Sequence, residues 1–167
     1  MQNRFFSFPN PVNDVAARSV GAGVLIMAIV CVATNTLWLT IPLAYGFVAR
    51  VLTGPRLSPL GRLATGVIAP RLDRYKKLVP GPPKRFAQAM GATFTVSALV
   101  LWLVGEGLAA RVLVGLLCVP ALLESVFGYC VGCKIFAVLM RHGIISEAIC
   151  LECADIYSRK TKTLQNS

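Results

Sequence analysis

The amino-acid sequence predicts an all-α protein: a polytopic membrane helical bundle of about four transmembrane helices, a short interfacial helix and a cysteine-rich C-terminal helical segment. Of the 167 residues, 56% are hydrophobic and 14% are charged, whereas about 25% are charged in a typical soluble domain. Uncharged segments recur at the length of about 20 residues that a helix needs to cross a bilayer. Lysine and arginine concentrate between two of these segments, as in a cytoplasmic loop.

The N-terminal half favours two short spans, residues 15–33 and 37–52. Arg18 and Arg50 bracket 31 uncharged residues, and the polar stretch "ATNT" interrupts them, which is typical of a turn between helices. Both arginines are expected near helix ends, with their side chains directed toward lipid headgroups. The alternative is a single long span broken near Pro42.

Two further spans follow the basic region. Residues 86–105 are uncharged, and the 22 residues between Arg111 and Lys134 contain a single charge, Glu124. This placement puts Glu124 near mid-span, with Thr95 of the preceding span at a similar depth. An acidic residue there is costly and marks a functional-site candidate, or a protonated carboxyl group that cross-links two helices.

The region from Arg50 to Arg85 carries nine basic residues and one acidic residue, a net charge of +8. This bias predicts an inner-membrane, multi-pass protein with this loop and both termini in the cytoplasm. Its position between apolar spans, without interleaved aromatic residues beyond Tyr75, argues against nucleic-acid binding. Within it, Ser58 as N-cap and Pro59 at the first turn predict a short helix that ends at Pro70 and lies on the membrane surface.

Residues 1–156 are expected to form one membrane-embedded domain, and residues 157–167 a disordered basic tail. Four of the six cysteines follow the fourth span as two CxxC pairs: Cys130, Cys133, Cys150 and Cys153. The boundaries of that span place the first pair in its last turn, on the cytoplasmic side, where structural disulfides are rare. That placement argues against a periplasmic, quinone-linked disulfide-forming enzyme.

The cysteine quartet permits two kinds of chemistry. Its spacing, C-x2-C-x16-C-x2-C, fits four thiolates around a structural zinc ion. Alternatively, if Gly128 ends the fourth span, Cys130 begins a new helix, where a lowered thiol pKa suits disulfide exchange or sulfur transfer. Helical phase places Cys130 roughly 120° around from Glu124, so the two are not expected to share a site. Cys31 and Cys118 are interpreted as small hydrophobic residues within spans.

Four phrases resemble the bacterial, largely actinobacterial, membrane family catalogued as domain of unknown function 4395. They are "FPNPVNDVAAR" (8–18), "ARVLTGPRLSPLGRLAT" (49–65), "VPGPPKRFAQ" (79–88) and "GYCVGCKIF" (128–136), and the resemblance extends over about residues 8–156. The family has no established activity. Its gene neighbours include thioredoxin-like proteins and rhodanese-type sulfurtransferases, so the resemblance implies thiol or sulfur chemistry at Cys130 and Cys133, and less directly at Cys150 and Cys153.

These observations lead to three hypotheses. The first is a thiol-redox or sulfur-relay protein that acts with a thioredoxin-like or rhodanese-type partner, with Cys130 and Cys133 as the reactive pair. The second is a non-enzymatic scaffold in which all four cysteines bind zinc. The third is a small carrier for a sulfur compound, with Glu124 on its path.

Overall fold

Three helices of the computed structural model are long and apolar enough to cross a membrane within the residues that the structure describes, 12–72, 74 and 78–144. They are α1 (Asp14–Ala33), α5 (Gly81–Leu103) and α6 (Gly107–Phe127). A shorter apolar segment joins the 3-10 turn η2 (Leu37–Leu39) to α2 (Thr40–Thr53). The predicted all-α membrane bundle is confirmed.

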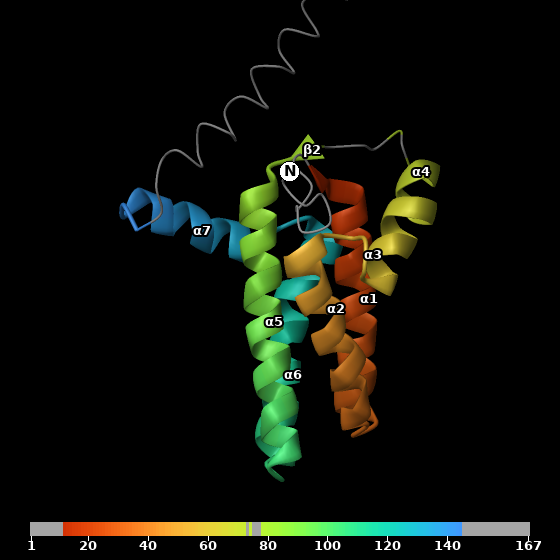
Figure 1. Ribbon diagram of the computed structural model, residues 1–167, viewed down its shortest axis with the longest axis vertical. Helices are drawn as coiled ribbons and strands as arrows, with labels where there is room; N and C mark the ends of the chain where they lie inside the picture. The colour runs from red at the N-terminus through yellow and green to blue at the C-terminus, as the bar shows by residue number, and fades with distance from the viewer. Residues whose placement is uncertain (1–11, 73, 75–77, 145–167) are drawn as a thin grey trace, which may run out of the picture.

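The four helices run alternately up and down the bundle (Figure 1). α1 packs along α6, and α5 packs between α2 and α6. The predicted break after the first span is present, because residues 34–36 separate α1 from η2 and Asn35 has a positive φ of 56°. At the opposite end of the bundle, β1 (Val12–Asn13) pairs with β2 (Leu78–Val79) in a short antiparallel ribbon. That ribbon holds the start of α1 beside the start of α5.

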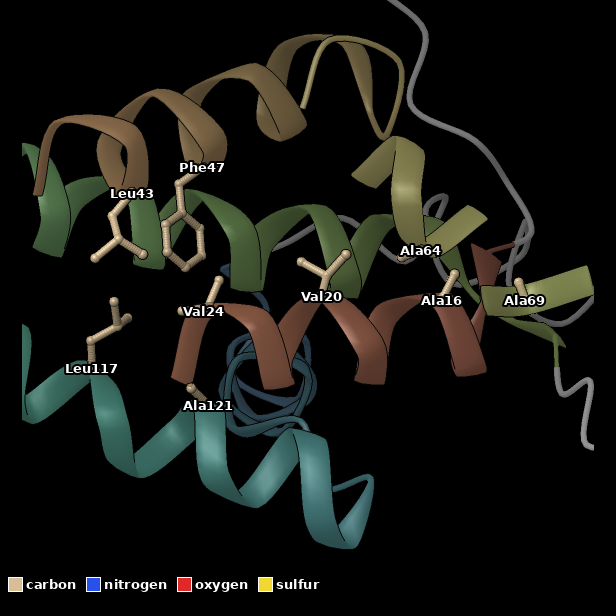
Figure 2. Close-up of a cluster of buried hydrophobic side chains, with 9 residues drawn as sticks. All are labelled: Ala16, Val20, Val24, Leu43, Phe47, Ala64, Ala69, Leu117 and Ala121. Atoms are coloured by element: carbon tan, nitrogen blue, oxygen red, sulfur yellow. The ribbon is translucent and has the colours of Figure 1, made fainter. Parts of the chain in front are cut away.

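The core consists of small and branched apolar side chains at the helix crossings. In the cluster of Figure 2, residues of α1, α2 and α6 interlock with two alanines of the segment after α2: Ala16, Val20, Val24, Leu43, Phe47, Ala64, Ala69, Leu117 and Ala121. A second cluster, nearer the Asn35 turn, contains Ala28, Cys31, Leu37, Ala98, Ala110 and Val114. Cys31 is fully buried there, as its interpretation as a small hydrophobic residue requires.

The segment after α2 is one helical stretch in three parts: α3 (Pro59–Leu63), the π-helical turn η3 (Ala64–Ile68) and α4 (Ala69–Arg71). Ser58 caps it by accepting a hydrogen bond from the N–H of Gly61 at 3.3 Å, as predicted. Ala64 and Ala69 pack on α1 (Figure 2), so the segment extends the bundle beside α1. It continues one residue past Pro70, to Arg71.

The boundaries of the last two spans differ from the prediction. α5 begins at Gly81, so Lys84 and Arg85 lie inside it. α6 runs from Gly107 to Phe127, so it includes Arg111 and ends well before Lys134. Gly128 ends it in the left-handed conformation, with a φ of 66° that glycine adopts without strain. The N–H of Gly128 donates to the Glu124 carbonyl, the bond of an αL cap, and that of Tyr129 donates to the Leu123 carbonyl.

Beyond Gly128 the chain starts a separate helix, α7 (Val131–Arg141). It leaves the bundle at a steep angle beside the upper part of α5 (Figure 1). The prediction that Cys130 and Cys133 lie in the last turn of the fourth span is therefore wrong. The alternative, in which Gly128 ends the span, describes the structure.

Candidate thiol site

Cys130 is the N-cap residue of α7. Its Sγ accepts a hydrogen bond from the N–H of Cys133 at 3.3 Å, within the first turn of the helix. The side chain is buried, with 9% of its surface exposed. A sulfur at this position lies at the positive end of the helix, where backbone N–H groups stabilise a thiolate.

Two contacts hold α7 against α5. Gly132 lies so close to Ala87 that an added Cβ would be 2.5 Å from the Cβ of Ala87 and 2.6 Å from its Cα. One turn later the rings of Phe136 and Phe86 pack with their centroids 5.6 Å apart. These contacts fix the start of α7, and with it Cys130, on the side of the bundle.

A buried ion cluster lies next to this helix start. Nζ of Lys84 is 2.7 Å from Oε1 of Glu124 and 3.3 Å from Oδ1 of Asp14. The Lys84 side chain is 6% exposed and each acidic side chain is 15% exposed. The three groups come from α5, α6 and α1, so the cluster ties three helices together. A buried cation of this kind is stable only with charged partners and hydrogen bonds.

Glu124 therefore does not have the environment that the sequence predicted. It lies in the last turn of α6, and Lys84 lies in the first turn of the antiparallel α5. Thr95 is deeper in the bundle, where its hydroxyl donates to the Gly91 carbonyl at 2.8 Å. The expected pairing of Glu124 with Thr95 is replaced by an ion pair, which gives the carboxylate a counter-charge and removes the need for a protonated cross-link.

Of the two arginines that were expected to reach headgroups, Arg50 binds inside the bundle instead, and Arg18 lies half-buried at a helix end. Arg50 is 4% exposed; its Nε donates to Oε1 of Gln88 at 2.8 Å and its Nη1 to Oγ of Ser58 at 2.9 Å. Arg18 donates to the carbonyl of Val126 at 2.7 Å, at the C-terminal end of α6. The Arg18 guanidinium thereby satisfies carbonyls that the end of α6 leaves unpaired.

Lys84, Asp14 and Gln88 were not singled out from the sequence, because Lys84 falls in a proline-rich basic run that was interpreted as a connector. One signal was present. Two prolines precede Lys84, and proline is favoured in the first turn of a helix. Starting α5 at those prolines would have placed Lys84 inside the third span.

The environment differentiates the two thiols. The pKa of Cys130 is lowered from its ordinary value, chiefly because the Cys133 side chain hydrogen-bonds to its thiolate. Burial and the Glu124 carboxylate oppose this shift, and the Lys84 ammonium supports it. The same hydrogen bond and burial raise the pKa of Cys133. Of the two thiols, Cys130 therefore has the greater thiolate character.

A cavity of about 380 Å³ reaches this site. Its lining is mostly apolar and comes from α1, α2, α5, α6 and α7, and it includes Cys130, Glu124 and Gln88. The expectation that Cys130 and Glu124 occupy different sites is wrong, because the helix ends at Gly128 and its phase does not continue to Cys130. The structure brings the Cys130 thiol and Glu124, one member of the ion cluster, together at one cavity.

The second cysteine pair, Cys150 and Cys153, lies outside the described residues, so the four-cysteine zinc site remains a prediction. Among residues 12–72, 74 and 78–144, no group of three or more His, Cys, Asp and Glu side chains is arranged to hold a metal ion. His142 caps the C-terminal end of α7, at the opposite end of that helix from Cys130. Any zinc at Cys130 and Cys133 would need ligands from the C-terminal residues.

The fold and the site together define a small helical membrane protein with a buried N-capping cysteine beside an apolar cavity. Residues 12–141 match the family model described as Domain of unknown function (DUF4395), and the chain belongs to that family. Comparison with curated proteins and with solved structures found no match.

Proposed function

We propose that this protein is a membrane-bound thiol-redox or sulfur-relay protein, in which Cys130 is the attacking thiolate and Cys133 the resolving thiol. One observation carries the proposal: Sγ of Cys130 caps α7 and accepts the Cys133 N–H at 3.3 Å. Capping stabilises a thiolate, and the CxxC spacing places a second thiol one turn away, as disulfide exchange requires.

In disulfide exchange, the Cys130 thiolate attacks a partner's disulfide and forms a mixed disulfide, while the second partner sulfur leaves as a thiolate. Cys133 then loses its proton and attacks Sγ of Cys130. The Cys130–Cys133 disulfide forms, and the partner leaves fully reduced. In sulfur relay, the Cys130 thiolate attacks the outer sulfur of a partner's persulfide and takes it over, while the partner leaves as a thiolate.

The partner in this proposal is a cytosolic thioredoxin-like or rhodanese-type protein of the bacterial cell. The proposed orientation puts both termini and the basic end of the bundle in the cytoplasm, across the inner membrane. α7 carries Lys134 and Arg141, and Arg71 ends α4 at the same end of the bundle (Figure 1). Positive charge at this end of the bundle favours the approach of an acidic partner surface.

Two matched variants test the proposal. With a thioredoxin-like partner in its disulfide form, Cys133→Ser is expected to accumulate a mixed disulfide through Cys130, because the resolving thiol is absent. Cys130→Ser is expected to accumulate none. If both variants trapped equal amounts of mixed disulfide, the attack could not be assigned to Cys130, and the proposed roles would be refuted.

Metal analysis with thiol counting tests the scaffold alternative, which the spacing of the four cysteines supports. One zinc per chain with four unreactive thiols would establish a structural site and exclude the relay. The carrier alternative has less support, since Glu124 is already neutralised by Lys84 at 2.7 Å and is not free to bind a cationic or protonated cargo.

A further inference from the structure

The cavity beside Cys130 opens toward lipid. Leu116 and Val119 line it, yet 53% and 58% of their surfaces remain exposed. Both belong to α6, a helix long and apolar enough to cross a membrane. Exposed apolar side chains on such a helix face acyl chains, so a molecule dissolved in the bilayer reaches the cavity without crossing water.

The few polar groups of the cavity suit a ligand with hydrogen-bond acceptors. Oε1 of Gln88 accepts the Arg50 Nε–H at 2.8 Å, which orients the amide and leaves Nε2 with two donor hydrogens that bond no other described residue. Gln88 lines the cavity, so its amide supplies a hydrogen-bond donor in an otherwise apolar space.

We propose that this cavity binds the ring of a membrane-soluble quinone, which accepts two electrons from the Cys130–Cys133 dithiol. The inference rests on the proposed function, because it names the electron acceptor of the same thiol pair. A quinone combines a flat apolar ring with two carbonyl acceptors and enters from lipid. A volume of about 380 Å³ lies at the small end of the range for ligand sites, ~300–1,000 Å³, and suits a single substituted ring.

The reaction balances with the groups present. The Cys130 thiolate adds to a ring carbon, forming a C–S bond, and one quinone oxygen takes a proton. Cys133 loses its proton and attacks Sγ of Cys130, so the S–S bond forms and the C–S bond breaks with its electron pair left on the ring. The second oxygen is protonated and hydroquinone leaves. In sum, a dithiol and a quinone give a disulfide and a hydroquinone. A cytosolic partner in its dithiol form then reduces the Cys130–Cys133 disulfide, by the reverse of the exchange described above, and leaves as a disulfide.

The test uses the full chain in nanodiscs, reduced and then freed of reductant without oxygen. A short-chain ubiquinone analogue is added, and its reduction is followed by ultraviolet absorbance. Val119→Trp fills the mouth of the cavity and is expected to slow reduction at least tenfold. Val112→Trp is the matched control: Val112 is 54% exposed and does not line the cavity, and seven positions of α-helix place it on nearly the same face. It is expected to react within twofold of the wild type.

A second variant probes binding without filling the cavity. Gln88→Glu keeps an oxygen acceptor for Arg50 but removes the amide donor, so the KM for the quinone is expected to rise at least fivefold. Equal quinone reduction by the Val119 and Val112 variants would overturn the cavity assignment. Both tryptophan variants replace exposed side chains, and equal melting temperatures verify their folding.

A parallel measurement separates this inference from the proposed function. Each protein is also oxidised by a soluble thioredoxin-like disulfide, and the thiols are counted. Thiols that exchange with the soluble disulfide but never reduce the quinone would overturn the quinone inference and leave the proposed function standing. Thiols that react with neither would overturn both.

Discussion

Replacing Gly132 with alanine tests whether the contact between α7 and α5 positions the thiol site. The new Cβ would lie 2.5 Å from the Cβ of Ala87 and 2.6 Å from its Cα, whereas carbon atoms in contact are normally ~3.5–4.0 Å apart. α7 must therefore move by about 1 Å. Overpacking costs ~1–3 kcal/mol, and the upper end applies here because a backbone atom cannot rotate away.

A cost of about 3 kcal/mol shifts the equilibrium between docked and detached α7 by about a hundredfold, since 1.4 kcal/mol is a factor of ten. Hydrogen–deuterium exchange of the peptide that covers α7 measures this shift directly. Exchange in α7 is expected to accelerate by up to that factor, while the buried turns of α1 and α5 stay protected. A detached helix of 11 residues is only marginally stable in isolation, so its first turn and the N-cap bond of Cys130 are lost when it unfolds. The alkylation of Cys130 is then expected to depend on pH as that of an ordinary thiol does.

Gly115→Ala in α6 is the matched control, because no atom lies within 4 Å of an added Cβ there. Alanine in an open helical position is expected to stabilise slightly, by up to ~1 kcal/mol. Unchanged exchange of α7 in Gly132→Ala would show that the close contact does not hold the helix, and the account of how Cys130 is positioned would be refuted.

Three further outcomes follow from the site. The pKa of Cys130 is lowered, so the pH at which its alkylation rate is half-maximal is expected to lie below the ordinary thiol pKa of ~8.5. In Cys133→Ala, which lacks the hydrogen-bonding thiol, this pH is expected to rise toward that value. Glu124→Gln weakens a buried ion pair and is expected to cost about 3 kcal/mol of folding free energy, whereas exposed Glu106→Gln is expected to change it by less than ~0.5 kcal/mol, both measured by denaturation in detergent. Arg18→Met removes the hydrogen bonds to the last carbonyls of α6 and is expected to cost ~1–2 kcal/mol; a melting temperature equal to that of the wild type would exclude a capping role.

The sequence was most informative where the evidence is local. Apolar length predicted the helices, the polar residues around Asn35 predicted the first turn, and Ser58 and Pro59 predicted the start of α3. The special conformation of glycine made Gly128 a possible end for the fourth span, and the structure uses it in this way. Each of these signals depends on a few neighbouring residues, so it is readable from a single chain.

The wrong prediction of the partner of Glu124 shows what local sequence evidence does not determine. Both the third and the fourth span begin about five residues earlier than their charge boundaries predicted. Because the helices are antiparallel, the two shifts add, and the predicted partner Thr95 moves about 15 Å along the bundle from Glu124 at ~1.5 Å per residue. The residue that takes its place, Lys84, had been assigned to a loop.

The sequence by itself determined that this protein is a bundle of apolar helices with its basic residues gathered at one end and a CxxC pair near the end of the last span. Tertiary structure alone decided that Lys84 forms ion pairs with Glu124 and Asp14, that Arg50 turns inward, and that Cys130 shares a cavity with Glu124. Periodicity and composition determine which side chains lie on each face of a helix. The axial offset between packed helices, set by where each one starts and by close contacts such as Gly132 on Ala87, fixes which of those residues meet.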